Sequence, residues 1–188
     1  MSKLRIIGGR YRGKRLQSPS DRLIRPTSER AREALFNILD HGDLVADRRF
    51  LDLFCGTGAV GLEAFSRGSS EVWLIDQDIT LASANVRDFG SPAALELRRL
   101  DATRLGRPTG RFDTVFLDPP YRSGLAEPAL LALSRGWLAV GAVIVVELAA
   151  KEPLEPPSTF EIWQDRRYGA ASFRFLRWRG DEEGSGPS

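Results

Sequence analysis

The sequence contains one cysteine and one histidine among its 188 residues. A single cysteine excludes a disulfide within one chain, and the two residues together cannot supply the about four ligands of a structural zinc site. Catalysis of the Ser-His-Asp or Cys-His kind would have to use His41, the only imidazole available. We therefore expect no bound metal and no catalytic nucleophile that is activated by a histidine.

Long apolar runs are missing as well. No segment reaches the ~18 consecutive apolar residues of a membrane span, and the run at residues 142–146 is far shorter. The first ten residues contain no apolar stretch typical of a secretory signal. Hydrophobic residues make up 42% of the chain and charged residues 28%, which is ordinary for a globular protein of about one domain. We expect a soluble cytoplasmic protein that does not contact a membrane.

Positive charge is concentrated at one end of the chain. Residues 1–32 hold ten of the 27 basic residues and only two of the 25 acidic residues, so this segment carries +8 and the remainder −6. A basic segment on an acidic body indicates a polyanionic partner, most simply nucleic acid. A solvated, charged extension is the alternative, because a charge run alone is weak information.

The remainder of the chain repeats a strand–loop–helix pattern. Short apolar strands are expected at residues 50–54, 71–75, 95–100, 112–117 and 141–146, with helices at 60–67, 79–88 and 125–137. Continuous apolar strands between helices predict a parallel sheet covered on both faces. Residues 159–163 and 171–176 are expected to add an antiparallel hairpin, joined by Tyr168 and Gly169.

The N-terminal region is expected to form a hairpin from residues 4–7 and 11–16. A helix follows, with Thr27 as its N-cap, an apolar stripe at residues 31, 34, 35, 38 and 39, and an end near residues 40–42. We assign residues 1–32 to a basic arm, residues 33–180 to one α/β domain and residues 181–188 to a disordered tail.

Four aspartates lie within or at the ends of successive predicted strands: Asp52, Asp76, Asp101 and Asp118. In an open α/β sheet, ligands bind outside the carboxyl ends of the strands. A turn or cap role would explain any one of these residues, but four in one repeating unit indicate a ligand site. A nucleoside supplies suitable donors in its ribose hydroxyls and its exocyclic amine.

The run Gly56-Thr57-Gly58-Ala59-Val60-Gly61 also matches a dinucleotide-binding fingerprint. However, Asp52 precedes this loop within its strand, and a pyrophosphate there would meet negative charge. S-adenosylmethionine fits better, because its amino group and sulfonium are positive and it carries no phosphate.

Residues 52–58, DLFCGTG, resemble the first motif of class I S-adenosylmethionine-dependent methyltransferases. This resemblance implies a Rossmann-like fold in which Asp52 orients the methionine amine and the loop glycines pass beside the cofactor. It also implies that Asp76 holds the ribose, with Asp78 as second choice, and that Asp101 and the Ala102 backbone contact adenine. The expected cofactor-binding set is Asp52, Phe54, Gly56, Gly58, Asp76, Asp101, Ala102, Asp118 and Thr27.

The predicted fourth strand is followed by residues that resemble the [D/N]-P-P-[Y/F] motif of amine methyltransferases. The expected catalytic residues are Asp118, Pro119, Pro120 and Tyr121. An amine on a purine is a poor nucleophile, and a carboxylate and a proline carbonyl can accept its two hydrogens. Tyr121 offers a face on which a flipped base stacks. Cys55 lies in the first motif, away from this loop, and is expected to be a small buried hydrophobe.

The N-terminal residues sharpen the resemblance. Residues 5–13 (RIIGGRYRG), 25–27 (RPT) and 30–37 (RAREALFN), together with the motifs above, are similar to the bacterial 16S ribosomal RNA guanine-N2 methyltransferases. The family implies methylation of one guanine N2 on the small ribosomal subunit or its assembly intermediate. We expect the protein to be a monomer. The expected RNA-binding residues are Arg5, Arg10, Arg12, Lys14, Arg15, Arg25 and Arg30.

Other functions remain open from the residues alone. The DPPY motif recognises an amine rather than a ring, so adenine N6 in DNA or RNA is an alternative target. A non-catalytic rRNA-binding assembly factor would keep the same fold, but the intact motifs argue against it. A nicotinamide enzyme is a more distant alternative.

Overall fold

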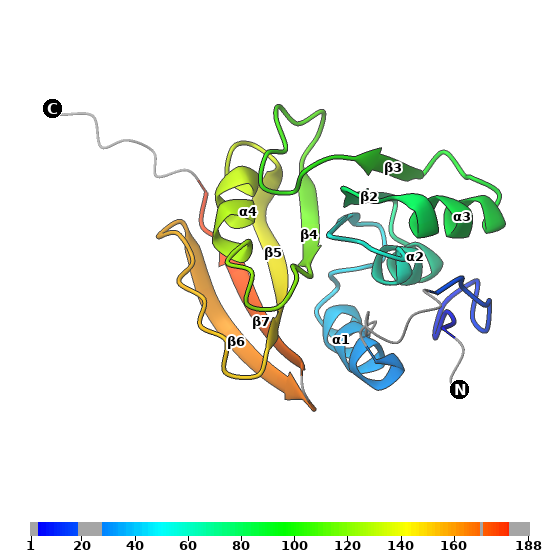
Figure 1. The fold of residues 1–188 in the computed structure, drawn as a ribbon, viewed down its shortest axis with the longest axis horizontal. Helices are drawn as coiled ribbons and strands as arrows, with labels where there is room; N and C mark the ends of the chain where they lie inside the picture. The colour runs from blue at the N-terminus through cyan, green and yellow to red at the C-terminus, as the bar shows by residue number, and fades with distance from the viewer. Residues whose placement is uncertain (1–3, 19–27, 170, 181–188) are drawn as a thin grey trace, which may run out of the picture.

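The computed structural model describes residues 4–18, 28–169 and 171–180. One seven-stranded sheet in the order β3-β2-β1-β4-β5-β7-β6 runs through the molecule (Figure 1). The strands are β1 (Arg49–Leu53), β2 (Glu71–Asp76), β3 (Leu95–Arg99), β4 (Phe112–Leu117), β5 (Leu138–Ala149), β6 (Phe160–Tyr168) and β7 (Ala171–Trp178). The helices are α1 (Glu29–His41), α2 (Ala59–Ser66), α3 (Thr80–Asp88) and α4 (Ala126–Leu133).

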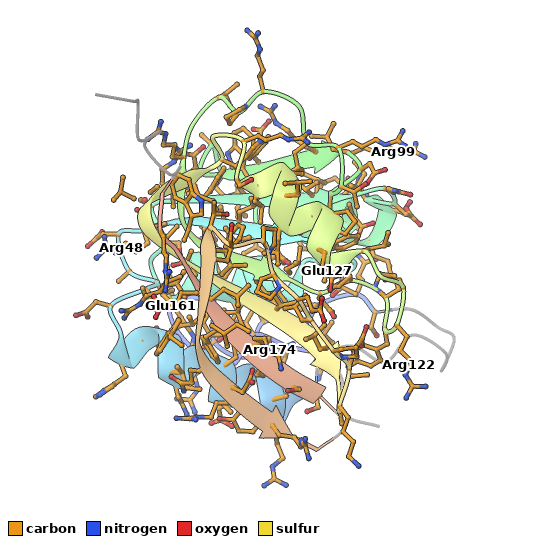
Figure 2. The ribbon with its side chains drawn as sticks, turned by 90° about the vertical axis from the view of Figure 1, so that its left-hand side faces the viewer. Arg48, Arg99, Arg122, Glu127, Glu161 and Arg174 are labelled. Atoms are coloured by element: carbon orange, nitrogen blue, oxygen red, sulfur yellow. The ribbon has the colours of Figure 1, made fainter. Side chains whose placement is uncertain are left out.

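The pairing confirms the predicted fold class. Strands β1 to β5 pair in parallel, whereas β7 pairs antiparallel with both β5 and β6. The strand order reverses between β1 and β4, and ligands bind at the carboxyl ends of the strands at such a switch point. On the far edge, Arg174 of β7 pairs with Asp165 of β6 over 2.8 Å, and Glu161 also lies on β6 (Figure 2).

The sheet separates two hydrophobic cores. Alternate side chains of one strand point to opposite faces, so Phe50 of β1 belongs to one core and Leu51 to the other. The first core packs under α1, α2 and α3, and the second packs under α4. Among the described residues, no helix has both the length and the apolar character needed to cross a membrane.

Residues 4–18 form the expected hairpin-like segment, with Arg5 and Arg15 in a single antiparallel bridge. Ile6 and Leu16 of this segment are buried in the first core. At Gly9, whose φ is +72°, a Cβ would lie 1.9 Å from the Ser66 carbonyl oxygen. The lack of a side chain at this position therefore allows the hairpin to lie directly against α2.

Several predicted boundaries shift. The N-cap of α1 is Ser28, whose hydroxyl accepts from the Ala31 amide, whereas Thr27 lies outside the described residues. Helix α4 ends at Leu133, before the predicted residue 137. Trp137 is instead buried in the second core, where its ring stacks on Phe112 at 6.1 Å. Strands β5, β6 and β7 extend beyond their predicted ranges, because cross-strand pairing continues into residues that are polar or exposed.

Candidate active site at the carboxyl edge of the sheet

The strand register brings acidic residues to one face at the switch edge. Asp52 of β1 pairs with Leu74 of β2 and with Phe116 of β4. Because alternate residues share a face, Asp76 and Asp118 follow two residues later on the same face as Leu74 and Phe116. Leu117 pairs with Val146, so Glu147 of β5 lies beside Asp118 at the next step. Four adjacent strands therefore present carboxylates toward the side covered by α2.

Asp52 is buried at the centre of this edge. Only 1% of the residue is exposed, and its Oδ2 accepts a 2.8 Å hydrogen bond from the Gly61 amide in α2. A Cβ on Gly61 would lie 2.2 Å from Leu74 Cδ2, so only glycine allows this approach. Burial raises the pKa of Asp52 to about 7, against the opposing effect of the Gly61 hydrogen bond and with a smaller contribution from the Asp76 charge. A cation bound beside Asp52 would stabilise its carboxylate.

The glycine loop between β1 and α2 is tightly wound. Gly56 and Gly58 both have positive φ, +52° and +76°, and the Gly58 amide donates to the Cys55 carbonyl over 2.7 Å. Phe54 has φ +58°, a strained value for a residue with a side chain. The Gly56 amide donates to Asp76 Oδ2 over 2.8 Å, which joins the loop to the end of β2. Thus the predicted cofactor residues of β1 and β2 lie together.

Three further residues with predicted cofactor contacts, Asp78, Asp101 and Ala102, lie just beyond β2 and β3. Asp78 accepts from both the amide and the hydroxyl of Thr80, and these bonds lower its pKa. Asp101 accepts from Thr103 in the same way, with the same effect on its pKa, and Ala102 beside it is buried. Both aspartates are thus ionised acceptors that begin turns at the carboxyl edge.

Cys55 is buried, as the sequence predicts, whereas His41 lies at the surface. Burial, together with the nearby carboxylates of Asp52 and Asp76, raises the thiol pKa of Cys55. A thiol held protonated is a poor nucleophile. His41 is an exposed residue at the end of α1.

The predicted catalytic loop follows β4 directly. The Asp118 amide donates to the Leu53 carbonyl over 3.2 Å, which fastens the loop to the end of β1. Pro119 is buried and Pro120 is exposed, while Tyr121 is 49% exposed and donates its hydroxyl hydrogen to Glu147 Oε1 over 3.1 Å. Burial raises the pKa of Asp118 well above its usual range, and the carboxylates of Glu147, Asp52 and Asp76 add to this effect.

The far end of the loop is held by Glu152. Its two carboxylate oxygens accept from the Arg122 amide at 2.7 Å and from the Ala149 amide at 2.9 Å. Arg122, which has a positive φ of 56°, points outward from the fold (Figure 2). The loop that carries Tyr121 is therefore fixed at both ends before any ligand binds.

Sequence reasoning missed two residues of this site. Glu147 is 2% exposed and follows the apolar run of β5 just as Asp76 and Asp118 follow the apolar runs of β2 and β4, so the same signal could have found it. Asn85 of α3 is fully buried; its side chain accepts from the Gln17 amide at 2.7 Å and donates to the Thr57 carbonyl at 2.9 Å. It connects the N-terminal hairpin to the glycine loop, and no local pattern marks that contact.

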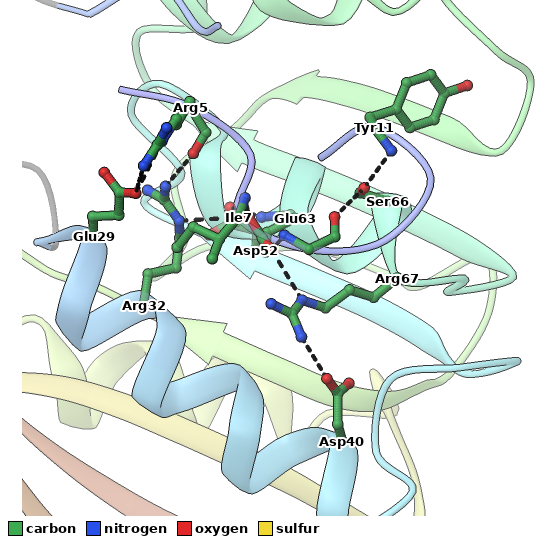
Figure 3. A network of polar contacts seen from close by, with 12 residues as sticks. Arg5, Ile7, Tyr11, Glu29, Arg32, Asp40, Asp52, Glu63, Ser66 and Arg67 are labelled. Carbon is green, nitrogen blue, oxygen red and sulfur yellow. Dashed lines mark hydrogen bonds and ion pairs between the residues drawn. The ribbon is translucent and has the colours of Figure 1, made fainter. Parts of the chain in front are cut away.

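The hairpin is fastened to α2 through a buried carboxylate (Figure 3). Glu63 accepts from the amides of Ile7 and Gly8 at 2.8 and 2.7 Å, and it pairs with Arg67 at 2.9 Å and Arg32 at 3.7 Å. Its side chain is completely buried. The basic hairpin is therefore a fixed part of the surface beside α2.

The predicted RNA-binding residues differ in their surroundings. Arg5 pairs with Glu29 over 2.8 Å, the Arg10 guanidinium lies over the Tyr11 ring, and Lys14 lies over the Phe89 ring. The residues that are exposed are Arg5, Arg10, Arg12, Arg15 and Arg30. Arg25 lies outside the described residues, as does Thr27.

Comparison with known proteins identifies the family to which the chain belongs. The sequence model of the family described as Conserved hypothetical protein 95 matches residues 4–177. The chain belongs to this family. It is 34% identical over 180 residues to the Ribosomal RNA small subunit methyltransferase D of Escherichia coli K12, covering 93% of this chain and 90% of that one. The protein of that name from Haemophilus influenzae is 33% identical over 183 residues, covering 93% and 94%.

This member of the Conserved hypothetical protein 95 family has the same fold as a protein of known structure. The Escherichia coli protein yhhF superposes with a TM-score of 0.81 at 32% identity, covering 96% of this chain and all of that chain. The two chains therefore share one overall fold over nearly their whole lengths. This fold is the Rossmann-like fold of class I methyltransferases.

The residues at the edge suit a cationic nucleoside ligand. Asp52 carries a raised pKa in a buried position, the carboxylates of Asp76 and Asp118 lie near it, and Glu147 lies beside Asp118. Clustered carboxylates repel one another, so a positively charged ligand relieves their repulsion. Open space lies where a Cβ on Gly56 would be, so the loop backbone is accessible to such a ligand. S-adenosylmethionine, with its ammonium and sulfonium groups, fits this set of donors and acceptors.

Proposed function

We propose that the protein transfers a methyl group from S-adenosylmethionine to the exocyclic N2 of a guanine in 16S rRNA of the small ribosomal subunit. The observation that carries the proposal is the position of the DPPY loop. Asp118 and Tyr121 follow β4 at the switch edge, beside the buried Asp52 and the glycine loop. The relatives named as small-subunit rRNA methyltransferases support the substrate class.

The methyl donor is S-adenosylmethionine, which supplies an electrophilic methyl group on a positively charged sulfur. Asp52 holds the amino group of the methionine part, and Asp76 holds the ribose hydroxyls. Asp101 and the Ala102 backbone contact the adenine, while the loop from Phe54 to Gly58 passes alongside. These residues bind and orient the donor, and positioning is the main source of acceleration for a displacement of this kind.

The DPPY loop prepares the acceptor amine. The Asp118 carboxylate and the Pro119 carbonyl accept the two hydrogens of the guanine N2, which draws the nitrogen toward tetrahedral geometry and restores its lone pair. Tyr121, half exposed at the loop, stacks on the base after it leaves the RNA stack. Asp118 then takes the proton released after transfer, since its pKa is raised by burial and by its carboxylate neighbours.

The N-terminal segment supplies contacts with the RNA backbone. We infer that residues 1–32 act as the RNA-contacting arm of a catalytic domain at residues 33–180, in a monomeric protein of the bacterial cytoplasm. The hairpin supports this role because Glu63 fastens its backbone at Ile7 and Gly8 to α2, and the same hairpin carries exposed arginines. Arginine–phosphate contacts are largely independent of sequence and sensitive to salt.

Radiolabelled methyl transfer tests the proposal. The protein is incubated with labelled S-adenosylmethionine and with undermethylated small subunits, naked rRNA or DNA, and the product nucleosides are separated. We expect labelled N2-methylguanine from the rRNA substrates. N6-methyladenine would favour an adenine methyltransferase, and the absence of label in every nucleic acid would favour a binding protein.

The variant Asp118→Ala separates methyl transfer from cofactor binding. We expect it to abolish methyl transfer while binding of S-adenosylmethionine, followed by calorimetry, persists. Glu152→Gln is the matched control, because it alters the brace at the other end of the loop and leaves the DPPY residues intact. Wild-type turnover by Asp118→Ala would contradict the proposed role.

A further inference from the structure

Glu147 occupies a position in the candidate site that no motif assigns. It lies near the end of β5, is 2% exposed, and accepts the hydroxyl hydrogen of Tyr121 over 3.1 Å. The register of β4 and β5 places it on the same face as Asp118, one strand away. The Tyr121 bond holds this buried carboxylate at the edge of the loop on which the target base is proposed to stack.

The two carboxylates differ in their relation to the loop. Asp118 belongs to the DPPY loop itself, whereas Glu147 stands on the neighbouring strand and contacts the outer end of the tyrosine ring. A base that stacks on Tyr121 with its amine at Asp118 would present the next group of its Watson–Crick edge toward Glu147. The identity of that group differs between purines.

Guanine and adenine present opposite groups at this position. Guanine carries an N1–H donor next to its N2 amine, whereas adenine carries an unprotonated N1 acceptor next to its N6 amine. An ionised carboxylate accepts from the first and repels the second. A pair of adjacent carboxylates therefore matches the two adjacent donors of guanine.

We propose that Glu147 is a specificity-determining residue that accepts the N1–H of the target guanine while Asp118 and Pro119 accept from its N2 amine. This inference rests on the proposed amine methylation and adds the choice of ring. Tyr121 has two connected roles: its face stacks on the base, and its hydroxyl holds Glu147 at the edge of that base. The DPPY motif selects an amine, and Glu147 selects guanine among the purines that carry one.

The purine 2-aminopurine provides the direct test, because it keeps the 2-amino group and replaces the N1–H donor with an acceptor. Once the methylated nucleotide is mapped, small subunits are reconstituted on rRNA with guanine or 2-aminopurine at that nucleotide. The kcat/KM ratio for the two substrates is measured for wild type and for Glu147→Gln. The missing O6 affects both enzymes alike, so it cancels when the two ratios are compared.

We expect Glu147→Gln to lower the wild-type preference for guanine over 2-aminopurine by about 10- to 100-fold, the scale of one specific base contact. Glu147→Asp, which restores a carboxylate, should keep more of the preference than Glu147→Gln. Glu152→Gln should leave the ratio at the wild-type value. If turnover of a variant is too slow to measure, the ratio of dissociation constants for the two RNAs replaces it.

Two failures are distinguishable. If the wild-type protein does not methylate guanine N2, the proposed function is wrong, whatever Glu147 does. If the wild type methylates guanine N2 and Glu147→Gln keeps the same preference, even with both rates reduced equally, then Glu147 is a structural residue and this inference is overturned.

Discussion

The Gly61 amide donates a 2.8 Å hydrogen bond to Asp52 Oδ2, which fastens the first turns of α2 to the strand before them. One donor does not offset the cost of burying this carboxylate, and the pKa of Asp52 is raised to about 7. Near neutral pH the folded protein thus holds a carboxyl group that is partly protonated without a ligand and becomes fully ionised beside a cation. Cofactor binding is therefore coupled to the release of a proton from Asp52.

The affinity for S-adenosylmethionine should therefore depend on pH. The bound ammonium group favours ionised Asp52, so binding releases a proton below the pKa of about 7. Linkage then gives an association constant that rises about fivefold between about pH 6 and pH 7.5, above which the free amino group of the ligand begins to lose its own proton. Calorimetric titration at several pH values measures this rise. Asp52→Asn should bind more weakly, and its association constant should vary less over the same range.

A flat affinity in the wild type across this window would contradict the assignment of Asp52 to the amino group. Asp101→Asn is a suitable control, since Asp101 is already ionised there because Thr103 lowers its pKa. That variant should weaken binding and preserve the rise with pH.

The buried carboxylate of Glu63 should govern the stability of the N-terminal hairpin. Glu63→Ala leaves two amides without their acceptor and the buried Arg32 guanidinium without its counter-charge. Loss of one partner from a buried pair costs about 3–5 kcal/mol, and the free energy of unfolding should fall by that order. Urea denaturation measures the change. Limited trypsin digestion should show faster cleavage within residues 10–15, because the hairpin is released from α2.

Arg5→Ala provides the contrast. Its ion pair with Glu29 is exposed, with 57% of the arginine side chain accessible, and such pairs contribute at most about 1 kcal/mol. Equal losses of stability in Arg5→Ala and Glu63→Ala would show that the buried network does not fasten the hairpin.

The sequence predicts those parts of the fold that local patterns encode. Apolar runs followed directly by aspartate identify β2 and β4, together with the edge at which the site lies. Glu63 could not be found this way, since an acid in an amphipathic helix is usually solvated. Its burial depends on amides of Ile7 and Gly8 more than fifty residues away in the chain.

The candidate site also combines residues that local patterns reveal with residues that only the folded structure reveals. Residues within motifs are identifiable because their spacing is local, whereas Asn85 and Glu147 act through contacts between separate elements. The apolar run of β5 was expected to end at Val146, so the acid that follows it was not included. The roles of the motif residues in binding and catalysis stay predictions until the variants are measured.

The exposed arginines of the hairpin should contribute to RNA affinity through counterion release. Replacement of Arg10, Arg12 and Arg15 with alanine should weaken binding to rRNA and reduce the slope of log affinity against log salt by about 2 to 3, at 0.7–0.9 per phosphate contact. Filter binding at several salt concentrations measures the slope. A control variant with the same charge change replaces Lys151, Arg166 and Arg167, which are exposed near the β6–β7 edge. Equal slopes in the two variants would contradict the assigned RNA surface.

The last prediction concerns the pH dependence of methyl transfer. The pKa of Asp118 is raised by burial and next by the charge of Glu147, and transfer requires the ionised carboxylate to accept from the amine. The rate at saturating substrate should therefore rise with pH as Asp118 loses its proton. Glu147→Gln removes the neighbouring charge, so the pKa of Asp118 falls and the rising limb of the profile moves to lower pH.

Glu152→Gln separates this electrostatic effect from a change in loop geometry. Glu152 braces the same loop through the Arg122 amide but is not among the charges that raise the pKa of Asp118. Its profile should keep the wild-type midpoint even if its rate is lower. A profile of Glu147→Gln that coincides with that of Glu152→Gln would mean that Asp118 titrates independently of Glu147. The charge of Glu147 would then have no effect on the pKa of Asp118.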